Sequence, residues 1–480
     1  MIRWGILGAG NIAHRFAASL TNEQNSILYA ISGRSAEKLE AFAKEYPCEK
    51  KYVGHDLLLE DENIDAIYLA LPHVMHKEWA LKALEKGIPV LCEKPAAVSE
   101  EETIGIAECA KRNNTLFMEA MKPRFVPAYL KMKELLASGA IGEIEKVETS
   151  MCFAMPKEFF GKSYHTAASG GGALLDGGIY CASILEDLLE GEPEPVKTYA
   201  TYFNGVDLYS DCTMKFGAKT AVLESGFDRN APKNAVICGS KGKLTVVNLH
   251  RPVTLILENE KGKEVIEAEY EHDDFYSQIH HFASLVSEGV HESPVMPYDA
   301  MIREAHILDV IRSQFAEYEE NDLNVLEEQE KELSVSSFDN ADALALGNVI
   351  AKTALEYDRG VSVRIDRVND DLTVFQYMME GKTAANLKYM DGKKKCVLDT
   401  GHSSAWAYVK NMITSEYEGW KKDGLHALSG GAFPLYVNDE LAYIIQVSGL
   451  HEGKDHELIV RSLSEWQEEK PYTDFIKALG

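Results

Sequence analysis

Three residues of this chain, Lys94, Asp176 and Tyr180, are of types that together can move a proton to and from an oxygen atom. Lys94 stands before a proline in Glu93-Lys94-Pro95, and a residue before proline is restricted to extended conformations, so its ammonium can point steadily at a bound hydroxyl or carbonyl. Asp176 and Tyr180 are four residues apart and would share one face of a helix. We expect Asp176 to orient a substrate hydroxyl and Tyr180 to exchange the proton.

This chemistry needs a Tyr180 pKa below the usual range, and a neighbouring Lys94 ammonium would lower it by favouring the phenolate. A purely structural interpretation is the alternative. Lys94 would then be a surface charge, Asp176 a helix cap and Tyr180 a core residue.

A glycine-rich turn opens the chain. Gly8-Ala9-Gly10-Asn11-Ile12-Ala13 has the form G-x-G-x-x-A and follows an apolar run directly. In such a turn Gly8 permits the tight bend, Gly10 lets the backbone approach a pyrophosphate, and the helix N-terminus faces the anion. We therefore predict a dinucleotide site with contacts from Gly8, Gly10, Asn11 and Ile12. Glycines that serve only the turn are the alternative.

The end of the second strand bears on the type of dinucleotide. NAD sites usually place Asp or Glu there for the ribose 2′-hydroxyl, but this chain reads Ile31-Ser32-Gly33-Arg34-Ser35. Arg34 could pair with a 2′-phosphate and Ser32 could hydrogen-bond to it. The pattern favours NADP, with NAD as the alternative if Arg34 is an ordinary exposed residue.

The elements that must position these residues change character along the chain. Residues 1–122 alternate apolar strands with amphipathic helices, which predicts a Rossmann domain with a parallel sheet covered on both faces. The expected strands are 2–7, 27–32, 66–71, 89–92 and 116–118, and the expected helices are 11–20, 35–46, 75–86 and 100–113. Lys94 then lies at the carboxyl end of the fourth strand, the edge where open α/β sheets bind ligands.

Residues 123–316 are rich in strands, which predicts an α+β domain with an open, largely antiparallel sheet. The expected strands are 144–153, 196–203, 212–216, 221–227, 235–238, 243–247 and 253–257, with helices at 127–137, 173–189, 274–287 and 298–315. We interpret this region as the substrate-binding and dimerisation domain.

Residues 317–333 are strongly acidic, with eight Asp or Glu against one Lys between 317 and 332. We interpret them as a linker, although a solvated helix face fits equally well. Residues 334–480 then predict a compact α/β domain large enough to fold alone. Its expected helices are 338–357, 383–389, 405–417 and 456–466, and its expected hairpins pair 361–365 with 372–376 and 433–437 with 442–447.

Composition excludes several classes of partner. The chain of 480 residues has a formal net charge of −27, so nucleic acid and anionic membranes would be repelled. No apolar stretch approaches the length of a membrane helix, and no signal peptide is visible. The eight cysteines form no C-x-x-C pair and no metal-ligand spacing. This usage indicates free thiols and a cytoplasmic location, and we expect no metal.

Residues 1 to about 316 resemble the Gfo/Idh/MocA family of oxidoreductases. The resemblance rests on the glycine turn, on Glu93-Lys94-Pro95 and on Gly170-Gly171-Gly172 through Asp176 to Tyr180, in this order and spacing. It implies a Rossmann domain followed by an α/β domain with an open sheet, and hydride transfer to or from a nicotinamide. Lys94 is by resemblance the motif lysine of the active site, and Asp176 lies in the substrate pocket.

Tyr180 stands where many members of that family have His. The tyrosine form, with Met118 to Phe125, is similar to the branch of dihydrodiol dehydrogenase and glucose-fructose oxidoreductase, which favours NADP and uses its Tyr as general acid and base. Dihydrodiol dehydrogenase usually has an aromatic residue near Lys122, so the resemblance does not extend to an aryl-diol substrate. The family implies further cofactor contacts at Leu71, His73, His76 and Glu93.

Two further side chains are candidate substrate contacts. Arg124 could bind substrate or phosphate, or pair with a carboxylate inside the protein, and His165 precedes the glycine run and could line the pocket.

Residues from about 334 to 480 resemble the UPF0303 family, itself similar to the haem-binding and haem-degrading HbpS/GlcG-like domains. The carrying segments are His402-Ser403-Ser404, Gly430 to Leu435, Val447 to Leu450 and Asp455-His456-Glu457. A haem site would need an axial ligand, and His402, His426 and His456 are the candidates. Turn glycines and an Asp455 helix cap are the structural alternative, and assembly is another role for the domain.

These observations predict an NADP-dependent oxidoreductase that acts on a secondary alcohol or ketone of a sugar, polyol or diol. Its partners would be a small-molecule substrate and further copies of the same chain, as a homodimer or higher homo-oligomer. Two other readings stay open. One is a non-catalytic NADP-dependent sensor, which has no need of Lys94, Asp176 and Tyr180 together. The other makes the dehydrogenase a redox partner of a C-terminal haem or small-ligand domain.

Overall fold

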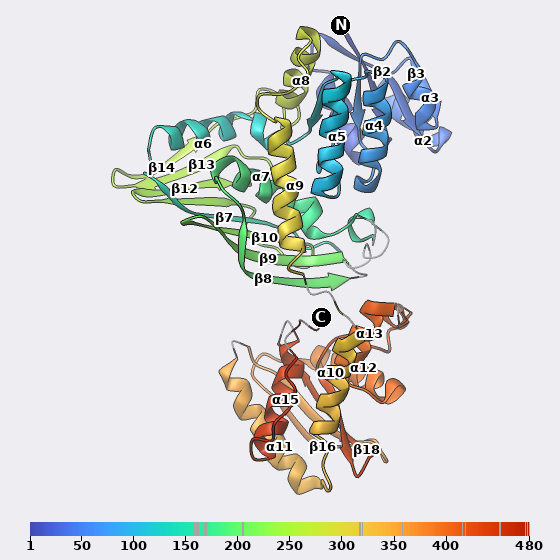
Figure 1. The fold of residues 1–480 in the computed structure, drawn as a ribbon, viewed down its shortest axis with the longest axis vertical. Helices are drawn as coiled ribbons and strands as arrows, with labels where there is room; N and C mark the ends of the chain where they lie inside the picture. The colour runs from blue at the N-terminus through green and yellow to red at the C-terminus, as the bar shows by residue number, and fades with distance from the viewer. Residues whose placement is uncertain are drawn as a thin grey trace. The chain divides into compact units, whose positions relative to one another are not determined.

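The computed structural model describes residues 1–156, 159, 163–167, 170–203, 206–315, 318, 320–357, 359–414, 416–417, 419–450, 453–475, 477 and 479. The chain divides into two compact units (Figure 1). The first comprises Met1–Thr198 and Val206–Phe315, and the second comprises Ala316–Gly480 with the short segment Tyr199–Gly205.

A six-stranded parallel sheet in the order β3-β2-β1-β4-β5-β6 opens the first unit. Its strands are β1 (Ile2–Leu7), β2 (Ser26–Gly33), β3 (Lys50–Val53), β4 (Ala66–Leu69), β5 (Val90–Cys92) and β6 (Phe117–Glu119). Its helices are α1 (Asn11–Leu20), α2 (Ala36–Glu45), α3 (His55–Leu59), α4 (His76–Glu85) and α5 (Glu100–Asn113). This arrangement confirms the predicted Rossmann-type sheet.

The apolar strands form this sheet because both of their faces are covered. All four residues of β4 and all three of β5 are buried, as continuous apolar runs in a parallel sheet should be. Strand β3 escaped prediction because it reads Lys50-Lys51-Tyr52-Val53 and lies at the sheet edge, where three of its four residues are exposed. An edge strand needs no apolar run, so it leaves little signal in the sequence.

The second sheet of this unit has eight strands in the order β14-β13-β12-β11-β7-β10-β9-β8. Strands β7 and β10 run parallel, while β10 pairs antiparallel with β9, β7 with β11, and β11 to β14 with one another in sequence. The strands are β7 (Ile144–Cys152), β8 (Glu194–Phe203), β9 (Val206–Phe216), β10 (Lys219–Gly226), β11 (Ala235–Gly239), β12 (Gly242–Val247), β13 (Thr254–Asn259) and β14 (Gly262–Glu267). The largely antiparallel α+β region is therefore confirmed.

Helices cover one face of this second sheet. Helix α6 (Pro127–Ala137) packs on β12 and β13, and α7 (Ile179–Leu188) packs on β7 and β10 (Figure 1). Two more helices, α8 (Tyr276–Glu288) and α9 (Tyr298–Arg312), connect it to the first sheet, since α8 packs on α1 and α9 packs on both α5 and α7. One continuous apolar core runs through both sheets.

The second unit is built on a four-stranded antiparallel sheet in the order β16-β15-β18-β17. Its strands are β15 (Ser362–Arg367), β16 (Leu372–Met378), β17 (Ala432–Val437) and β18 (Glu440–Ser448). Helices α11 (Asn340–Thr353) and α15 (Lys454–Trp466) pack together and on the sheet, while α12 (Ala384–Thr400), α13 (Ser404–Thr414) and α10 (Glu320–Glu332) form another group. The short α14 spans Trp420–Asp423. The predicted compact α/β architecture is confirmed.

The prediction of an acidic linker at residues 317–333 is wrong over its described part. Residues Glu317 and Glu319 lie outside the described residues, but Glu320–Glu332 forms helix α10 of the second unit. Leu323 and Leu326 are buried in a small apolar cluster with α13. Their spacing of three residues puts them on one helix face, a signal that the surrounding carboxylates obscured.

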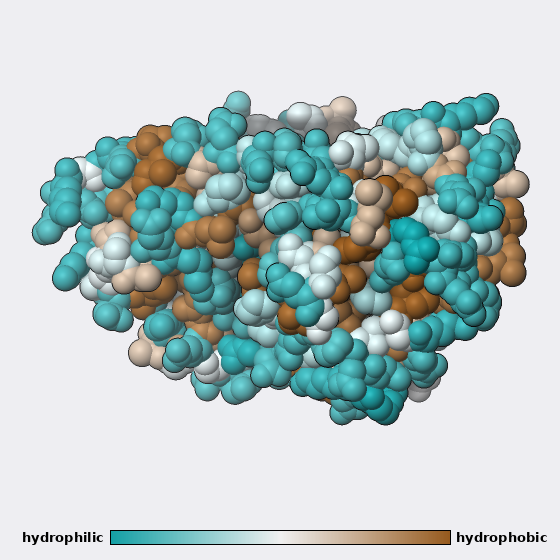
Figure 2. Space-filling model, turned by 90° about the horizontal axis from the view of Figure 1, so that it is seen from above, coloured by the Kyte–Doolittle hydropathy of each residue, from teal (hydrophilic) through white to brown (hydrophobic). Residues whose placement is uncertain are grey.

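Hydrophilic residues cover most of the surface in the view of Figure 2, and hydrophobic residues appear in areas between them. Within the described residues, no helix is both long enough and apolar enough to cross a membrane.

Candidate active site

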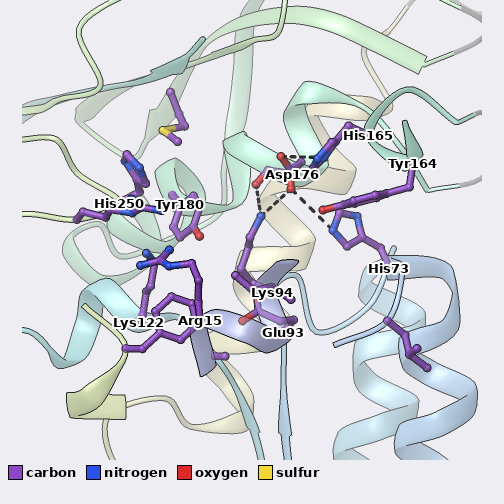
Figure 3. Close-up of a pocket in the computed structure, with 16 residues that line it drawn as sticks. Arg15, His73, Glu93, Lys94, Lys122, Tyr164, His165, Asp176, Tyr180 and His250 are labelled. Atoms are coloured by element: carbon purple, nitrogen blue, oxygen red, sulfur yellow. Dashed lines mark hydrogen bonds and ion pairs between the residues drawn. The ribbon is translucent and has the colours of Figure 1, made fainter. Parts of the chain in front are cut away.

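A cavity of about 290 Å³ lies in the first unit, at the carboxyl ends of β4, β5 and β6. This is the edge at which open α/β sheets bind ligands. The cavity brings together Lys94, Asp176 and Tyr180, which are up to 86 positions apart in the chain (Figure 3). Its lining residues are Ile12, Arg15, Leu71, His73, Glu93, Lys94, Ala120, Lys122, Met151, Tyr164, His165, Asp176, Tyr180, His250, Arg251 and Phe275.

Lys94 and Asp176 form a direct ion pair. The Lys94 ammonium donates to Asp176 Oδ1 and to the Asp176 backbone carbonyl, both at 2.7 Å. Each side chain is 11% exposed, so the pair faces the cavity and is otherwise enclosed. The Lys94–Pro95 peptide bond is cis.

Asp176 lies in a π-helical turn, Leu174–Gly178, which leads into α7, the helix that carries Tyr180. Such turns are rare and occur frequently at functional sites. The turn is held at its start by Asp207, which accepts a hydrogen bond of 2.6 Å from the Leu174 amide. Gly172 permits this approach, because it has φ +112° and a Cβ there would lie 2.3 Å from Asp207 Oδ1. The glycine run therefore sets the position of Asp176.

Two histidines complete the surroundings of the Asp176 carboxylate. His165 Nδ1 lies 3.4 Å from Oδ2, and His73 Nε2 lies 3.9 Å from Oδ1. Burial opposes ionisation of Asp176, but Lys94 and His165 outweigh it and hold the pKa of the carboxyl well below its usual range. Burial together with Lys94 lowers the pKa of His73 to about 3, so its ring is neutral. The site thus holds a stable ammonium and carboxylate.

Tyr180 differs from the sequence-based expectation in its acidity. Its ring is buried on α7, with the Lys94 ammonium 5.0 Å from the ring centroid. Burial raises the pKa of Tyr180 to about 12, and the opposing effect of Lys94 does not overcome it. The expected fall in pKa is therefore contradicted, because burial outweighs the effect of Lys94 and the negative charges of Glu93 and Asp176 raise the pKa further. Tyr180 is a protonated phenol at neutral pH, and its hydroxyl makes no hydrogen bond within the described part of the chain.

The glycine turn has the form that a dinucleotide requires. Gly8 has φ +103°, and a Cβ on it would lie 2.5 Å from the Ala70 carbonyl oxygen, so no other residue fits there. Gly10 precedes α1 without any side-chain cap, and a Cβ on it would meet nothing within 4 Å. Open space therefore lies over the first N–H groups of α1, where an anion is stabilised. Ile12 lines the cavity and Asn11 is exposed beside it.

The end of β2 places the two proposed 2′-phosphate ligands differently. Arg34 is exposed just beyond β2. Ser32 is fully buried, with its hydroxyl 2.8 Å from His55 Nδ1 and 3.3 Å from the Ile6 carbonyl. Ser32 is thus a core residue and not a cofactor contact, because its side chain points into the protein toward His55 and the Ile6 carbonyl.

Two other predicted contacts lie outside the cavity lining. His76 is fully buried on α4, and its ring nitrogens face the carbonyls of Pro95 and Leu71 at 2.8 Å each. It ties together the two segments that carry Lys94 and Leu71. Arg124 is 4% exposed and pairs with Glu304 at 2.8 Å, with Glu186, and with Ser183. It is an internal ion pair, as the structural alternative held, and no substrate contact.

The remaining predicted contacts all line the cavity. They are Leu71, His73, Glu93 and His165. The Glu93 carboxyl accepts a hydrogen bond from the Tyr68 hydroxyl, and burial raises the Glu93 pKa.

Sequence reasoning missed several lining residues, among them three cations and a histidine. Lys122 follows β6 at the same sheet edge as Lys94, so the edge rule could have identified it. Arg15 lies three residues after Ile12 on α1, which places both on one helix face. His250 and Arg251 come from the connection between β12 and β13, and no local pattern marks them.

The three candidate haem ligands of the second unit differ in whether a ring nitrogen is free to bind haem. His426 is held between Asp399 and Asp423, with its ring nitrogens 2.8 and 2.5 Å from their oxygens. His456 is buried on α15 and binds Gln329 through Nε2 at 2.9 Å. His402 Nδ1 binds Glu330 at 2.8 Å and lines a cavity of about 340 Å³.

The expected helix cap at Asp455 is also replaced. Helix α15 is preceded by Gly453 without a side-chain cap, and Asp455 accepts instead from Lys393 and from the Leu450 amide.

A dinucleotide-type sheet beside a cavity with a lysine–carboxylate pair and a buried tyrosine defines an NAD(P)-dependent dehydrogenase or reductase. Comparison with known families agrees. The model of the Gfo/Idh/MocA oxidoreductase family with an NAD-binding Rossmann fold matches residues 2–121, and the Gfo/Idh/MocA C-terminal domain matches residues 129–245. The model of the haem-degrading HbpS-like proteins matches residues 338–464.

Relatives match the first two thirds of the chain. Trans-1,2-dihydrobenzene-1,2-diol dehydrogenase of Danio rerio is 32% identical over 263 residues, which cover 53% of this chain and 78% of the relative. The NADP(+) scyllo-inositol 2-dehydrogenase IolU of Bacillus subtilis is 28% identical, over 65% of this chain and 97% of the relative. The chain belongs to the Gfo/Idh/MocA oxidoreductase family and carries an HbpS-like domain beyond it.

A solved structure supports the same assignment. KijD10, a 3-ketoreductase from Actinomadura kijaniata solved with NADP and TDP-benzene, is 27% identical with a TM-score of 0.60. The alignment covers 65% of this chain and 97% of that one.

Proposed function

We propose that this protein is an NADP-dependent oxidoreductase that transfers a hydride between the nicotinamide and a secondary alcohol or ketone of a sugar, polyol or diol. The observation that carries the proposal is the convergence of Lys94, Asp176 and Tyr180 on one cavity at the sheet edge. A non-catalytic sensor would need none of the three together. The relatives named as dihydrodiol and inositol dehydrogenases support the substrate class.

The bound nicotinamide supplies or accepts the hydride. The chain supplies the proton. In the reducing direction, Tyr180 donates its phenolic proton to the carbonyl oxygen, so one O–H bond breaks and another forms. The resulting phenolate lies beside Lys94, whose ammonium is 5.0 Å from the ring centroid and stabilises the new charge. Asp176 accepts a hydrogen bond from a neighbouring hydroxyl of the substrate. Its ion pair with Lys94 also keeps the ammonium in place.

The pKa of Tyr180 keeps it in the protonated state that ketone reduction requires. A phenol with a pKa of about 12 is protonated at neutral pH and ready to donate. Alcohol oxidation needs the phenolate instead, which is scarce at that pH.

The preference for NADP rests on Arg34. Its exposed guanidinium follows β2, and no carboxylate stands at residues 31–35 to bind a ribose 2′-hydroxyl. IolU is named for NADP(+), and KijD10 was solved with NADP. Arg34→Ser should raise KM for NADP⁺ about tenfold, the size expected for losing a charged hydrogen bond, and leave KM for NAD⁺ unchanged. Equal effects on the two cofactors would contradict the assignment.

The proposed activity is tested by following NADP⁺ and NAD⁺ reduction with a panel of sugars, polyols and their phosphates, and the reverse reaction with the matching ketones. Turnover that depends on Lys94 supports it. Turnover that survives Lys94→Met unchanged would contradict it.

We also infer a homodimer or higher homo-oligomer in a reducing cytoplasm. One face of the second sheet packs on α6 and α7, while the other carries half-buried Val222, Val236 and Val247 among polar residues. The eight cysteines are all free thiols, as is usual in reducing compartments. Light scattering of the purified chain tests the first inference, and a mass equal to one chain would contradict it.

A second candidate function belongs to the HbpS-like unit. His402 binds Glu330 through Nδ1, the arrangement in which metal-ligating histidines are usually held, and it lines a cavity. The same cavity is also lined by Glu327, Glu330 and Asp439, which would repel anionic haem propionates. Titration of the full chain with haem, compared with His402→Ala, tests the role. Absorbance spectra that are the same for both proteins would exclude His402 as the ligand.

A further inference from the structure

The cavity has a second wall that is cationic. Arg15 comes from α1, Lys122 from the short helical turn after β6 (Lys122–Phe125), and Arg251 from the connection between β12 and β13. Figure 3 shows Arg15 and Lys122 on the side of Tyr180 and His250, away from His73 and His165. The cavity therefore has a reacting end and a cationic end.

The cations of this end outnumber their counter-charge. All three pair with the same carboxylate, Asp274: Arg15 and Lys122 contact one oxygen each, and Arg251 Nε lies 3.2 Å from Oδ2. Asp274 is buried behind the wall and does not line the cavity. Within the described residues, three positive charges thus share one negative charge.

No other carboxylate of the wall restores the balance. Glu93 lines the same cavity, and its carboxyl accepts a hydrogen bond from the Tyr68 hydroxyl. Even with Glu93 ionised, three cations would face two carboxylates, so positive charge stays in excess. Burial lowers the pKa of Lys122 to about 8, and Arg251 and Arg15 add to the effect. Of the three cations only Lys122 is buried, whereas the side chains of Arg15 and Arg251 are 35% and 46% exposed and can reach an incoming anion. A buried cation such as Lys122 is stabilised when a counter-ion arrives.

The excess is also unusual for this protein. The chain as a whole carries a formal net charge of −27. A cluster of cations at one cavity end is therefore a local feature, and it would concentrate anions at that point.

His250 adds a donor to the same end. Its Nδ1 is buried with no hydrogen-bond partner among the described residues. Burial and the nearby cations, Lys122 first among them, lower the His250 pKa to about 3, so the ring is neutral and can donate one N–H. Its ring centroid lies 5.8 Å from that of Tyr180, whose own centroid is 5.0 Å from Lys94 Nζ. One small molecule can reach both ends.

We propose that Arg15, Lys122, Arg251 and His250 form an anion subsite, and that the substrate is an acidic sugar or polyol carrying a phosphate or a carboxylate. The inference rests on the proposed oxidoreductase function and specifies its substrate. Arginine forks suit both anions because they donate two parallel hydrogen bonds. The anionic group is held at this end while the reacting hydroxyl or ketone faces Lys94, Asp176 and Tyr180.

Anion binding is tested first without turnover. Isothermal titration with inorganic phosphate is run on the full chain saturated with NADP⁺, so that the cofactor already fills its own phosphate contacts. Arg251→Gln and Lys122→Gln should each weaken phosphate binding at least tenfold. Lys131→Gln, at a half-buried lysine of α6 that pairs with Glu134 outside the cavity, should have no effect. Phosphate binding that is absent, or the same in all four proteins, would overturn the subsite.

The substrate class is tested with matched neutral and anionic compounds: glucose, glucose 6-phosphate and glucuronate, then glycerol, glycerol 3-phosphate and glycerate. At least one acidic compound should exceed its neutral partner tenfold or more in kcat/KM. A preference for the phosphate esters or for the acids identifies which anion is used. Arg251→Gln should remove most of the preference. Equal or better use of the neutral partners would overturn the proposal.

A third measurement separates the subsite from the cofactor and from the activity itself. If the variants raise Kd for NADP⁺ and leave the preference for acidic substrates intact, the cluster binds the cofactor and the proposal is wrong. Binding of the preferred acidic compound to Lys94→Met, measured by titration, does not depend on turnover. Binding of the acidic compound would therefore be seen even if the proposed reaction were wrong. A failure of the anion subsite can thus be told apart from a failure of the proposed activity.

Discussion

The same ion pair occurs in both units, with different surroundings. Lys94 and Asp176 meet at 2.7 Å in the first unit, and Lys393 and Asp455 meet at 2.8 Å in the second. Lys94 faces a cavity and has Tyr180 beside it. Lys393 is 1% exposed and lines no cavity described for this chain.

The partners of the second pair are backbone groups. Lys393 also donates to the Val447 carbonyl at 3.2 Å, and Asp455 accepts from the Leu450 amide at 2.9 Å. This pair therefore ties α12, the end of β18 and α15 together. The reaction proposed for the first pair therefore depends on the adjoining cavity and on Tyr180, neither of which is present at the second pair among the described residues.

The largest effect that would separate the two pairs is on turnover. Lys94→Met should lower kcat by about 10³-fold, because both the support of Tyr180 and the position of Asp176 are lost. Thermal unfolding of the variant serves as the control. Its Tm should fall only slightly, because the Asp176 carboxylate still contacts His165 and water in the cavity. Unchanged kcat would make the two pairs equivalent.

Lys393→Met should produce the converse result. Removing one partner of a fully buried pair typically costs about 3–5 kcal/mol, so the unfolding transition of the second unit should shift to lower urea concentration. The reaction at Lys94 should keep its kcat/KM. Lys395→Met, an exposed neighbour on α12 paired with Asp399, is the matched control. A loss of turnover without a loss of stability would break the distinction.

Tyr180→Phe tests what the first pair supports. We expect kcat to fall by about 10²-fold or more, since general acid–base catalysis contributes at least that much. KM should change little because the ring still fills the same space. Tyr129→Phe removes a buried hydroxyl that binds Asp187 outside the cavity, and it should leave kcat unchanged. Equal effects of the two substitutions would remove Tyr180 from the proposed role.

The smallest expected effect is the change in oxidation rate with pH, which is about tenfold for each pH unit. With a pKa raised to about 12, the phenolate fraction of Tyr180 falls tenfold for each pH unit below that value. Alcohol oxidation should therefore rise with pH between 6 and 9 and ketone reduction should stay nearly level. Tyr180→Phe should flatten the oxidation profile. An oxidation rate that levels off near pH 7 would show that bound ligands lower the Tyr180 pKa.

Much of the fold was accessible to sequence reasoning because it follows local patterns. The apolar runs at β1, β4 and β5 are long enough to identify, and the glycine turn lies directly between β1 and α1. The edge strand β3 was missed and the helix α10 was only one of two alternatives, because polar residues dominate both and only their neighbours show which face is buried.

The candidate site divides in the same way. Lys94, Asp176 and Tyr180 could be chosen from the sequence because their types and spacing suit the chemistry and because they stand in motifs that resemble the family's. Ser32 and His76 could not be assigned correctly, since the direction of a side chain near a strand end depends on the packing around it.

The sequence by itself determined the family and most of the strands and helices of the first unit, and it marked Lys94, Asp176 and Tyr180 as candidates, because each of these depends on short-range patterns. Only the tertiary structure decided that the Tyr180 pKa rises and that Arg15, Lys122 and Arg251 share one carboxylate at the other end of the cavity. Burial and electrostatics sum over every group that surrounds a site. Those groups come from segments far apart in the chain, so no local spacing records them.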